Sequence, residues 1–205
     1  MASMNRYKLH QIKKVRVSVL LLVAGLWLGA CGEAVDTKTD AVAYFDVGKI
    51  ANMVHNDLQK PGKDFRKYAV LNTLSHIDTI TSIEAGAELE LLKDFDINKK
   101  AWVGLFAETR ADSGEYSFIS YKALNEKPDV QSLAITENTL TGTLTIDGII
   151  RKSNKIYSME KRLTAQLRKG KFGYELHDAR MQGYQKIILV DSLRFDVLYN
   201  IISGS

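Results

Sequence analysis

The only cysteine of the chain carries its clearest chemical signal. Cys31 directly follows Leu28, Gly29 and Ala30. A branched apolar residue and two small residues before a cysteine form the pattern at which a thiol takes diacylglycerol and the preceding peptide bond is cut. We expect Cys31 to become a lipidated first residue. No thiol then remains for disulfide, metal or nucleophilic chemistry.

The residues ahead of Cys31 have the layout of an export signal. Residues 17–30 are uncharged and mostly apolar, a run of 14, whereas a membrane-spanning helix needs about 20. A short apolar core behind a basic start predicts a cleaved signal peptide over residues 1–30, with a short membrane helix as the alternative. In this layout the chain resembles a bacterial lipoprotein. The basic start consists of Arg6, Lys8, Lys13, Lys14 and Arg16.

This resemblance implies a place in the cell envelope and a membrane as partner. Two or more acyl chains on Cys31 hold a protein on a bilayer stably. Gly32 follows the cysteine, where an aspartate would favour retention at the inner membrane. The resemblance therefore implies the outer membrane rather than the inner membrane and leaves the leaflet open.

Removal of residues 1–30 changes the charge of the protein. The full chain has 28 Lys and Arg against 24 Asp and Glu, and five of these bases but none of the acids lie in the leader. Residues 31–205 thus carry a net charge of −1. The basic pI of about 9.0 therefore comes from the predicted export signal and not from the mature protein. This excludes nucleic acid as an expected partner.

Basic residues are concentrated in the C-terminal part of the chain. Residues 151–194 hold 11 bases and 4 acids, whereas residues 33–147 hold 12 bases and 19 acids. On a strand, Arg162 and Arg168 share one face with Thr164 and Gln166. This face is a candidate for anionic lipid, lipopolysaccharide or an acidic envelope protein; the other interpretation is a solvated hairpin face. The candidate residues are Arg151, Lys152, Arg162, Arg168, Lys169 and Lys171.

The other polar motifs predict no metal or cofactor. Residues 94–98 begin like a calcium loop (Asp-Phe-Asp-Ile-Asn), but Lys99 replaces the glycine of the turn and Leu105 the final glutamate. This rejects an EF-hand and favours a capped turn, with a looser calcium site as the alternative. The histidines His55, His76 and His177 lack metal-ligand spacing.

These observations favour a non-enzymatic binding or scaffolding module, because no catalytic motif is recognisable. Two alternatives stay open. One is a carrier of a small apolar ligand, with a β-lined pocket that includes Tyr116, Phe118 and Tyr174, although core packing explains these aromatics equally well. The other is a hydrolase whose site is assembled from distant residues around one of the histidines.

Two helices are predicted near the start of the mature chain. Residues 31–40 are small and polar and predict a tether, followed by one domain over residues 41–205. Asp46 is a candidate N-cap for a helix whose apolar residues recur at helical spacing from Val47 to Leu58, before Pro61. Asp64 is a candidate N-cap for a second helix.

Beyond these helices the apolar residues recur with a period of two, which predicts strands. A helix remains possible over 83–91 and over 159–169. The pattern indicates an α+β domain, in which one or two N-terminal helices pack on a mainly antiparallel β-meander or half-barrel. The predicted strands are 83–91, 101–109, 115–124, 139–147, 162–168, 171–177, 186–190 and 193–201.

Two short motifs resemble a family of bacterial proteins. Tyr44-Phe45-Asp46 and the segment 96–102 (Asp-Ile-Asn-Lys-Lys-Ala-Trp) are similar to motifs of uncharacterised envelope lipoproteins of Bacteroidota-type bacteria. Lys100 stands where proline is common in that pattern. The resemblance implies an envelope lipoprotein without an assigned activity and supplies no catalytic residues.

Overall fold

The computed structural model describes residues 44–204, which belong to one compact unit, Asp40–Ser205. The predicted leader, the tether and the lipid site at Cys31 lie outside the described residues. No helix within the described part is long and apolar enough to cross a membrane.

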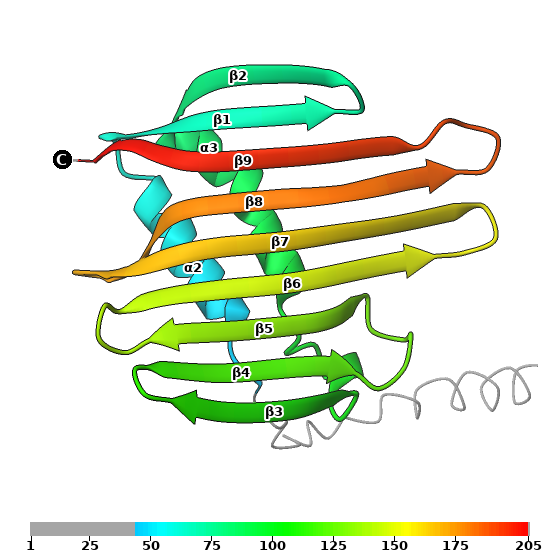
Figure 1. The fold of residues 1–205 in the computed structure, drawn as a ribbon, viewed down its shortest axis with the longest axis horizontal. Coiled ribbons are helices and arrows are strands. Elements are labelled where there is room, and N and C mark those ends of the chain that lie inside the picture. Colours follow the sequence, from blue (N-terminus) through cyan, green and yellow to red (C-terminus); the bar gives the residue numbers. More distant parts are fainter. Residues whose placement is uncertain (1–43, 205) are drawn as a thin grey trace, which may run out of the picture. The chain divides into compact units, whose positions relative to one another are not determined.

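Nine antiparallel strands form one open sheet in the order β2-β1-β9-β8-β7-β6-β5-β4-β3 (Figure 1). Seven strands, β3 to β9, follow one another as a meander, and β1 pairs with the last of them. The prediction of helices packed on a mainly antiparallel β-meander is thus confirmed in its coarse form, and the sheet is open. The strands are β1 Lys63–Leu71, β2 Leu74–Thr81, β3 Phe106–Ser113, β4 Tyr116–Ala123, β5 Val130–Asn138, β6 Thr143–Ser153, β7 Tyr157–Gly170, β8 Gly173–Ile187 and β9 Leu193–Gly204.

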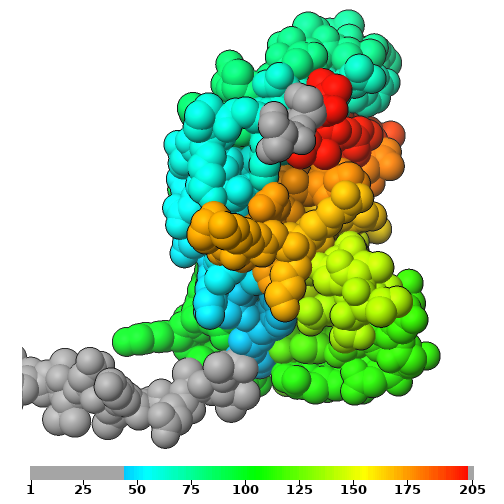
Figure 2. Space-filling view, turned by 90° about the vertical axis from the view of Figure 1, so that its left-hand side faces the viewer, coloured from blue at the N-terminus to red at the C-terminus, as the bar shows by residue number. Residues whose placement is uncertain are grey.

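The helices cover one face of this sheet (Figure 1). They are α2 (Val47–Leu58), α3 (Ser82–Glu88) and two 3₁₀ segments, η1 (Leu89–Phe95) and η2 (Lys100–Trp102). The β7–β8 turn reaches α2 at one end of the sheet (Figure 2), where Lys60 Nζ lies 5.1 Å from the centroid of the Phe172 ring. Among the described residues, nothing covers the opposite face of the sheet (Figure 1).

The first predicted helix is confirmed as α2. Asp46 caps it, because its side chain accepts a hydrogen bond of 2.7 Å from the Lys49 N–H. Val47, Val54 and Leu58 are buried against the sheet, as the helical spacing predicts.

The helix predicted after Asp64 is wrong. Residues 63–71 form β1, which pairs with β2 on one side and with β9 on the other. Ladder hydrogen bonds on both sides outweigh the weak helical spacing of Phe65 and Tyr68. The β9 partner lies more than 120 residues away in the chain, so no local pattern reveals it.

The strand predicted over 83–91 is wrong, and the helical alternative is correct. Thr81 and Glu84 form a capping box that starts α3. Ala85, Leu89 and Leu92 then recur at helical spacing and are buried. This helix follows β2, so the helices do not all precede the sheet.

The hairpin over 101–124 is confirmed, but its first strand begins later than predicted, at Phe106. The hairpin of β7 and β8 is also confirmed, and the rival helix over 159–169 is wrong. Leu163, Ala165 and Leu167 alternate toward the helix layer and are all buried, which only a strand allows.

The remaining strand predictions are partly confirmed. Strand β6 starts at Thr143 rather than Thr139, because Asn138 Oδ1 accepts from the Leu140 and Thr141 N–H groups and closes a turn. The predicted strand over 193–201 is β9, whereas residues 188–190 form a turn. Strands β2 and β5 were not predicted.

The two motifs of the family resemblance lie against each other. Asn98 Oδ1 accepts from the Tyr44 N–H at 3.0 Å, and its Nδ2 donates to the Phe45 carbonyl at 3.2 Å. Tyr44 packs edge-on against Phe106 and Tyr121, with ring centroids 5.5 and 5.4 Å away. These motif residues therefore hold the first described segment on the sheet.

We expect Asn98→Ala to destabilise the protein by about 1–3 kcal/mol, because it leaves backbone groups of this segment without partners. Urea unfolding measures the change. Asn125→Ala is the matched control, since Asn125 makes one exposed turn contact, to Lys127 N–H. Equal effects of the two substitutions would contradict the structural role of Asn98.

Candidate functional site

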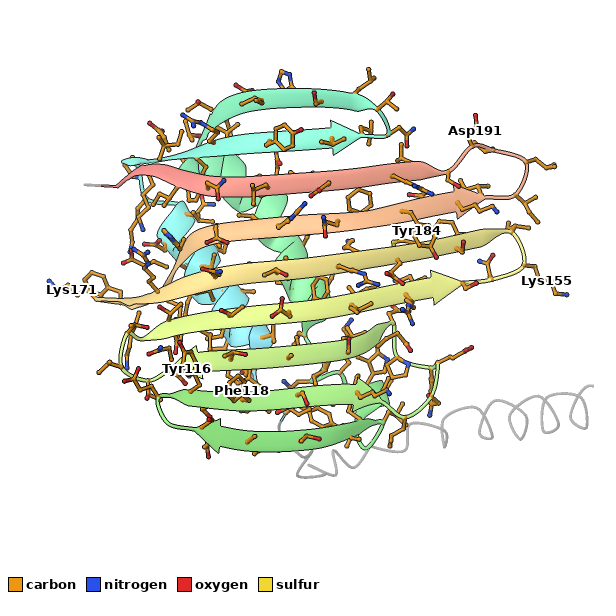
Figure 3. All side chains as sticks on the ribbon, viewed as in Figure 1. Tyr116, Phe118, Lys155, Lys171, Tyr184 and Asp191 are labelled. Carbon is orange, nitrogen blue, oxygen red and sulfur yellow. The ribbon has the colours of Figure 1, made fainter. Side chains whose placement is uncertain are left out.

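The uncovered face of the sheet is polar where β4 to β8 lie side by side (Figure 3). Because side chains alternate along a strand, the buried residues point to the helices and their neighbours to this open face. Cross-strand pairing aligns the open-face residues in two rows. One row is Ser120, Ala134, Asp147, Thr164 and Arg180; the other is Lys122, Ser132, Ile149, Arg162 and Gln182.

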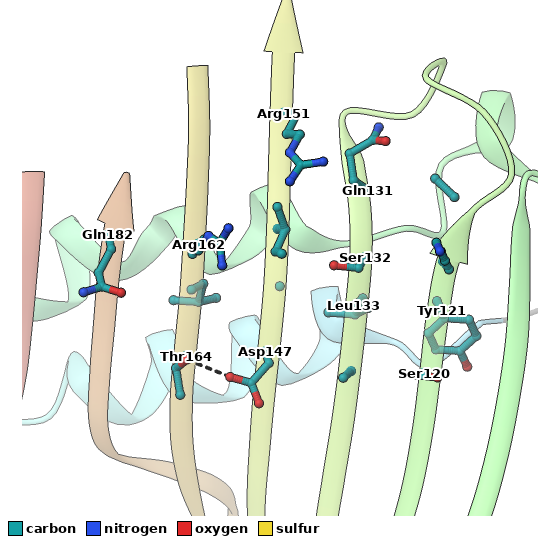
Figure 4. A pocket seen from close by; sticks show the side chains of 16 residues that line it. Ser120, Tyr121, Gln131, Ser132, Leu133, Asp147, Arg151, Arg162, Thr164 and Gln182 are labelled. Atoms are coloured by element: carbon teal, nitrogen blue, oxygen red, sulfur yellow. Dashed lines mark hydrogen bonds between the residues drawn. The ribbon is translucent and has the colours of Figure 1, made fainter. Parts of the chain in front are cut away.

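All of these residues except Arg180 line a groove of about 670 Å³ on the open face (Figure 4). Its volume suits a small ligand or a segment of a chain-like one. Hydroxyl, amide, carboxylate and guanidinium groups supply most of the side chains. The open-face residues that line it are Ser120, Lys122, Gln131, Ser132, Ala134, Asp147, Ile149, Arg151, Arg162, Thr164 and Gln182.

Two guanidinium groups in the groove share one carboxylate. The Nε atoms of Arg151 and Arg162 each donate to Glu160 at 2.7 Å, to different carboxylate oxygens. These hydrogen bonds hold the pKa of Glu160 below its usual range. Within the described residues, the Nη groups of both arginines have no hydrogen-bond partner. The arrangement holds two guanidiniums side by side with donors to spare.

Other hydrogen bonds fix the polar side chains around them. Thr164 Oγ1 donates to Asp147 Oδ1 at 2.7 Å. Gln182 Nε2 donates to Asp196 Oδ2 at 3.0 Å, and Arg180 binds the same carboxylate through two hydrogen bonds. The Arg180 hydrogen bonds lower the pKa of Asp196. The side chains of this surface are thus preorganised.

The six predicted basic residues do not form one site. Arg162 and Arg168 lie on the open face of β7 with Thr164 and Gln166, as predicted. Arg151 belongs to the neighbouring strand β6 and lies beside Arg162. Lys152 pairs instead with Asp129 at 2.8 Å. Lys169 lies near the end of β7 and Lys171 in the β7–β8 turn, at the end of the strands away from the groove arginines. Only Arg151 and Arg162 line the groove.

The three histidines lie on separate elements. His55 belongs to α2, His76 to β2 and His177 to β8, where His177 Nε2 lies 3.1 Å from Arg168 Nη2. The described residues contain no cluster of three or more His, Cys, Asp or Glu that fits a metal ion. Asp96 Oδ1 accepts from the Asn98 N–H at 3.1 Å, which is the capped turn expected there.

The predicted aromatic pocket residues are divided between the two faces. Tyr116 and Phe118 stack on the open face, with ring centroids 6.0 Å apart (Figure 3). Tyr174 points to the helix face, where its hydroxyl donates to Glu137 at 3.2 Å. These three side chains therefore do not line one cavity.

The sequence did not point to Ser120, Lys122, Gln131 or Gln182, which line the groove. The available signal was the set of polar residues that alternate with apolar residues along each predicted strand. That signal marks a solvated face as well as a binding face, and only strand pairing shows which polar residues become neighbours.

Comparison of the chain with protein-family models, with curated proteins and with solved structures finds no match.

Proposed function

We propose that this protein is a lipid-anchored, non-enzymatic binding protein of the bacterial cell envelope, and that its open sheet face binds an acidic oligosaccharide. The Leu28–Cys31 motif and the layout of the leader support the anchor. The groove over β4 to β8 supports the binding role. An anionic partner at Arg151 and Arg162 agrees with the charge of residues 151–194.

The observation that carries the choice of ligand is the pair of arginines in a hydroxyl- and amide-lined groove. A guanidinium binds a carboxylate through two parallel hydrogen bonds. The hydroxyl and amide groups of Ser120, Thr164 and Gln182 match the donors and acceptors of sugar hydroxyls. Tyr116 and Phe118 on the same face offer apolar surface to a sugar ring. Acidic sugars combine all three kinds of group.

The contacts of the groove favour binding over catalysis. No histidine stands among the described residues that line it. Its carboxylate Asp147 accepts a hydrogen bond from Thr164, and the nearby Glu160 is held ionised by two arginines. An ionised carboxylate between two guanidiniums positions these cations rather than transferring a proton.

Calorimetric titration of the lipidated protein with oligogalacturonate tests the binding role. We expect saturable binding, and about tenfold or greater weakening in the double variant Arg151→Gln/Arg162→Gln, since a charge-assisted hydrogen bond contributes about 1.5–3 kcal/mol. Arg110→Gln is the matched control, because Arg110 pairs with Glu108 two residues earlier on β3, as Arg162 pairs with Glu160. It should leave the affinity unchanged.

Three results would contradict this role. The first is the absence of binding. The second is equal affinity for an uncharged malto-oligosaccharide, which would remove the need for the arginines. The third is equal affinity for inorganic polyphosphate, which would replace the sugar by a general polyanion.

A further inference from the structure

Exposed aliphatic side chains gather at one end of the sheet. Strands β1, β4, β6 and β8 all finish at this end because neighbouring strands are antiparallel (Figure 1). Leu189 is fully exposed, Ile156 is 62% exposed and Val190 is 61% exposed. Single exposed apolar residues are ordinary, whereas a cluster marks an interaction surface. We call this cluster the apolar end; it comprises Ile156 of the β6–β7 turn and Ile188, Leu189 and Val190 of the β8–β9 turn.

Hydrogen bonds link the turns that carry the apolar end. The Ile188 N–H donates to the Ile156 carbonyl at 2.9 Å, which joins the β8–β9 turn to the β6–β7 turn. Asn72 and Arg194 exchange two hydrogen bonds of 2.8 Å, which join the β1–β2 turn to the start of β9. Asn154 Oδ1 accepts from the Ile156 N–H at 2.9 Å and closes that turn. The β6–β7 and β8–β9 turns therefore present one connected surface, and the shorter β1–β2 turn ends behind them (Figure 1).

The conformation of Leu189 is a second observation. Its φ is +67°, a region that a bulky residue rarely adopts. The same residue exposes its whole side chain to water. No buried contact of Leu189 offsets this strained backbone, and such strain gathers at functional segments.

Charge around the apolar end favours an anionic surface. Lys155, Lys186 and Arg194 lie at these turns or beside them, and Asp191 is the acidic residue of the β8–β9 turn (Figure 3). Lys152 is neutralised by its pair with Asp129. Exposed aliphatic side chains with basic residues beside them match a bilayer that carries anionic headgroups. The aliphatic side chains contact the acyl chains, and the basic side chains pair with the phosphates.

We propose that the apolar end inserts shallowly into an anionic lipid bilayer. This proposal rests on the lipid anchor proposed above. Tyr44, the first described residue, contacts Gly104 and Phe106 ahead of and at the start of β3, at the same end of the sheet. Residues 32–43 separate it from Cys31, and an extended chain of that length reaches about 45 Å at most. The nine-stranded sheet is about 40 Å wide, which is less than the reach of this segment. The lipid on Cys31 can therefore lie in the bilayer while this end of the sheet faces it.

A fluorescent probe tests the insertion directly. Because lipid occupies Cys31, Leu189→Cys gives the lipidated protein one free thiol for an NBD label. In vesicles of phosphatidylethanolamine and phosphatidylglycerol, we expect a blue-shifted emission and about fivefold lower quenching by aqueous iodide, as a depth of about 5–10 Å implies. The matched control is Thr141→Cys in the exposed β5–β6 turn, at the opposite end, where the label should stay in water.

Charge reversal tests the contribution of the headgroups. We expect Lys155→Glu/Lys186→Glu to restore iodide quenching of the label at position 189 in these vesicles. Unchanged protection in that variant would overturn the role of anionic lipid.

Each remaining outcome is decisive. A protein that floats with the vesicles while the label at 189 stays in water overturns this inference and leaves the anchor intact. If the label at 189 is protected from iodide only in native envelope membranes, the apolar end binds an envelope protein and not lipid. That result also overturns the inference. Equal protection of the labels at positions 189 and 141 overturns the proposed orientation, in which the apolar end alone faces the bilayer. A protein that fails to float overturns the anchor and this inference together.

Discussion

Gly148→Val is expected to lower the free energy of unfolding by about 3 kcal/mol or more, enough to unfold much of a marginally stable protein. Gly148 lies on the helix face of β6, in the middle of the sheet. A Cβ atom there would clash with Phe95 Cδ1 and lie 2.7 Å from Phe95 Cε1. Phe95 is completely buried, so the ring has no free space to enter.

Urea unfolding followed by circular dichroism measures this effect. Gly148→Ala should cost less, about 1–3 kcal/mol, because it adds one methyl group. Thr145→Val is the matched control, since it places a branched apolar side chain on the open face of the same strand. We expect Phe95→Leu to recover part of the loss in Gly148→Val, and a double-mutant cycle measures that coupling. Full stability of Gly148→Val would show that the helix layer is not packed on β6.

Cys31→Ser is expected to abolish lipid attachment completely. The hydroxyl of serine does not replace the thiol in forming the proposed thioether, so no labelled palmitate should enter the protein. Without acyl chains the membrane affinity collapses, because each buried CH₂ group contributes about 0.8 kcal/mol. The protein should then remain an uncleaved precursor or leave the membrane fraction.

Metabolic labelling and membrane fractionation measure both effects. Gly32→Ser is the control, because it changes the next residue and keeps the thiol. Cys31→Ser/Thr141→Cys adds a second control, in which a thiol at another position should not restore labelling. Palmitate incorporation into Cys31→Ser at the unsubstituted level would refute the lipid anchor.

Much of the local structure could be predicted from the sequence, because its causes are local. Asp46 caps α2 through the Lys49 N–H, three residues away. The β3–β4 hairpin closes around Gly114, whose φ of +59° favours glycine. The alternation of Leu163, Ala165 and Leu167 identifies a face of β7. Each of these signals lies within one turn or one strand.

The errors arose where distant partners decide the outcome. Phe65 and Tyr68 fit a helix by spacing, yet β1 forms because β2 and the distant β9 supply hydrogen bonds on both sides. The alternation of residues 83–91 suggested a strand, yet Ala85, Leu89 and Leu92 bury one helical face in the core. Burial against a distant segment exceeds the small differences in local propensity.

The candidate site likewise has features that follow from local sequence and features that only the fold creates. The lipid anchor is a prediction from the sequence alone, because the signal around Cys31 is a linear pattern, and the sequence also shows that bases concentrate in residues 151–194. Only the tertiary structure decided which of these bases meet: strand register places Arg151 and Arg162 around Glu160 and leaves Lys152 with Asp129. It also brought the turns of the apolar end together. The physical reason is that register and strand order are set by the burial of a whole sheet face on the helices, a property of residues far apart in the chain.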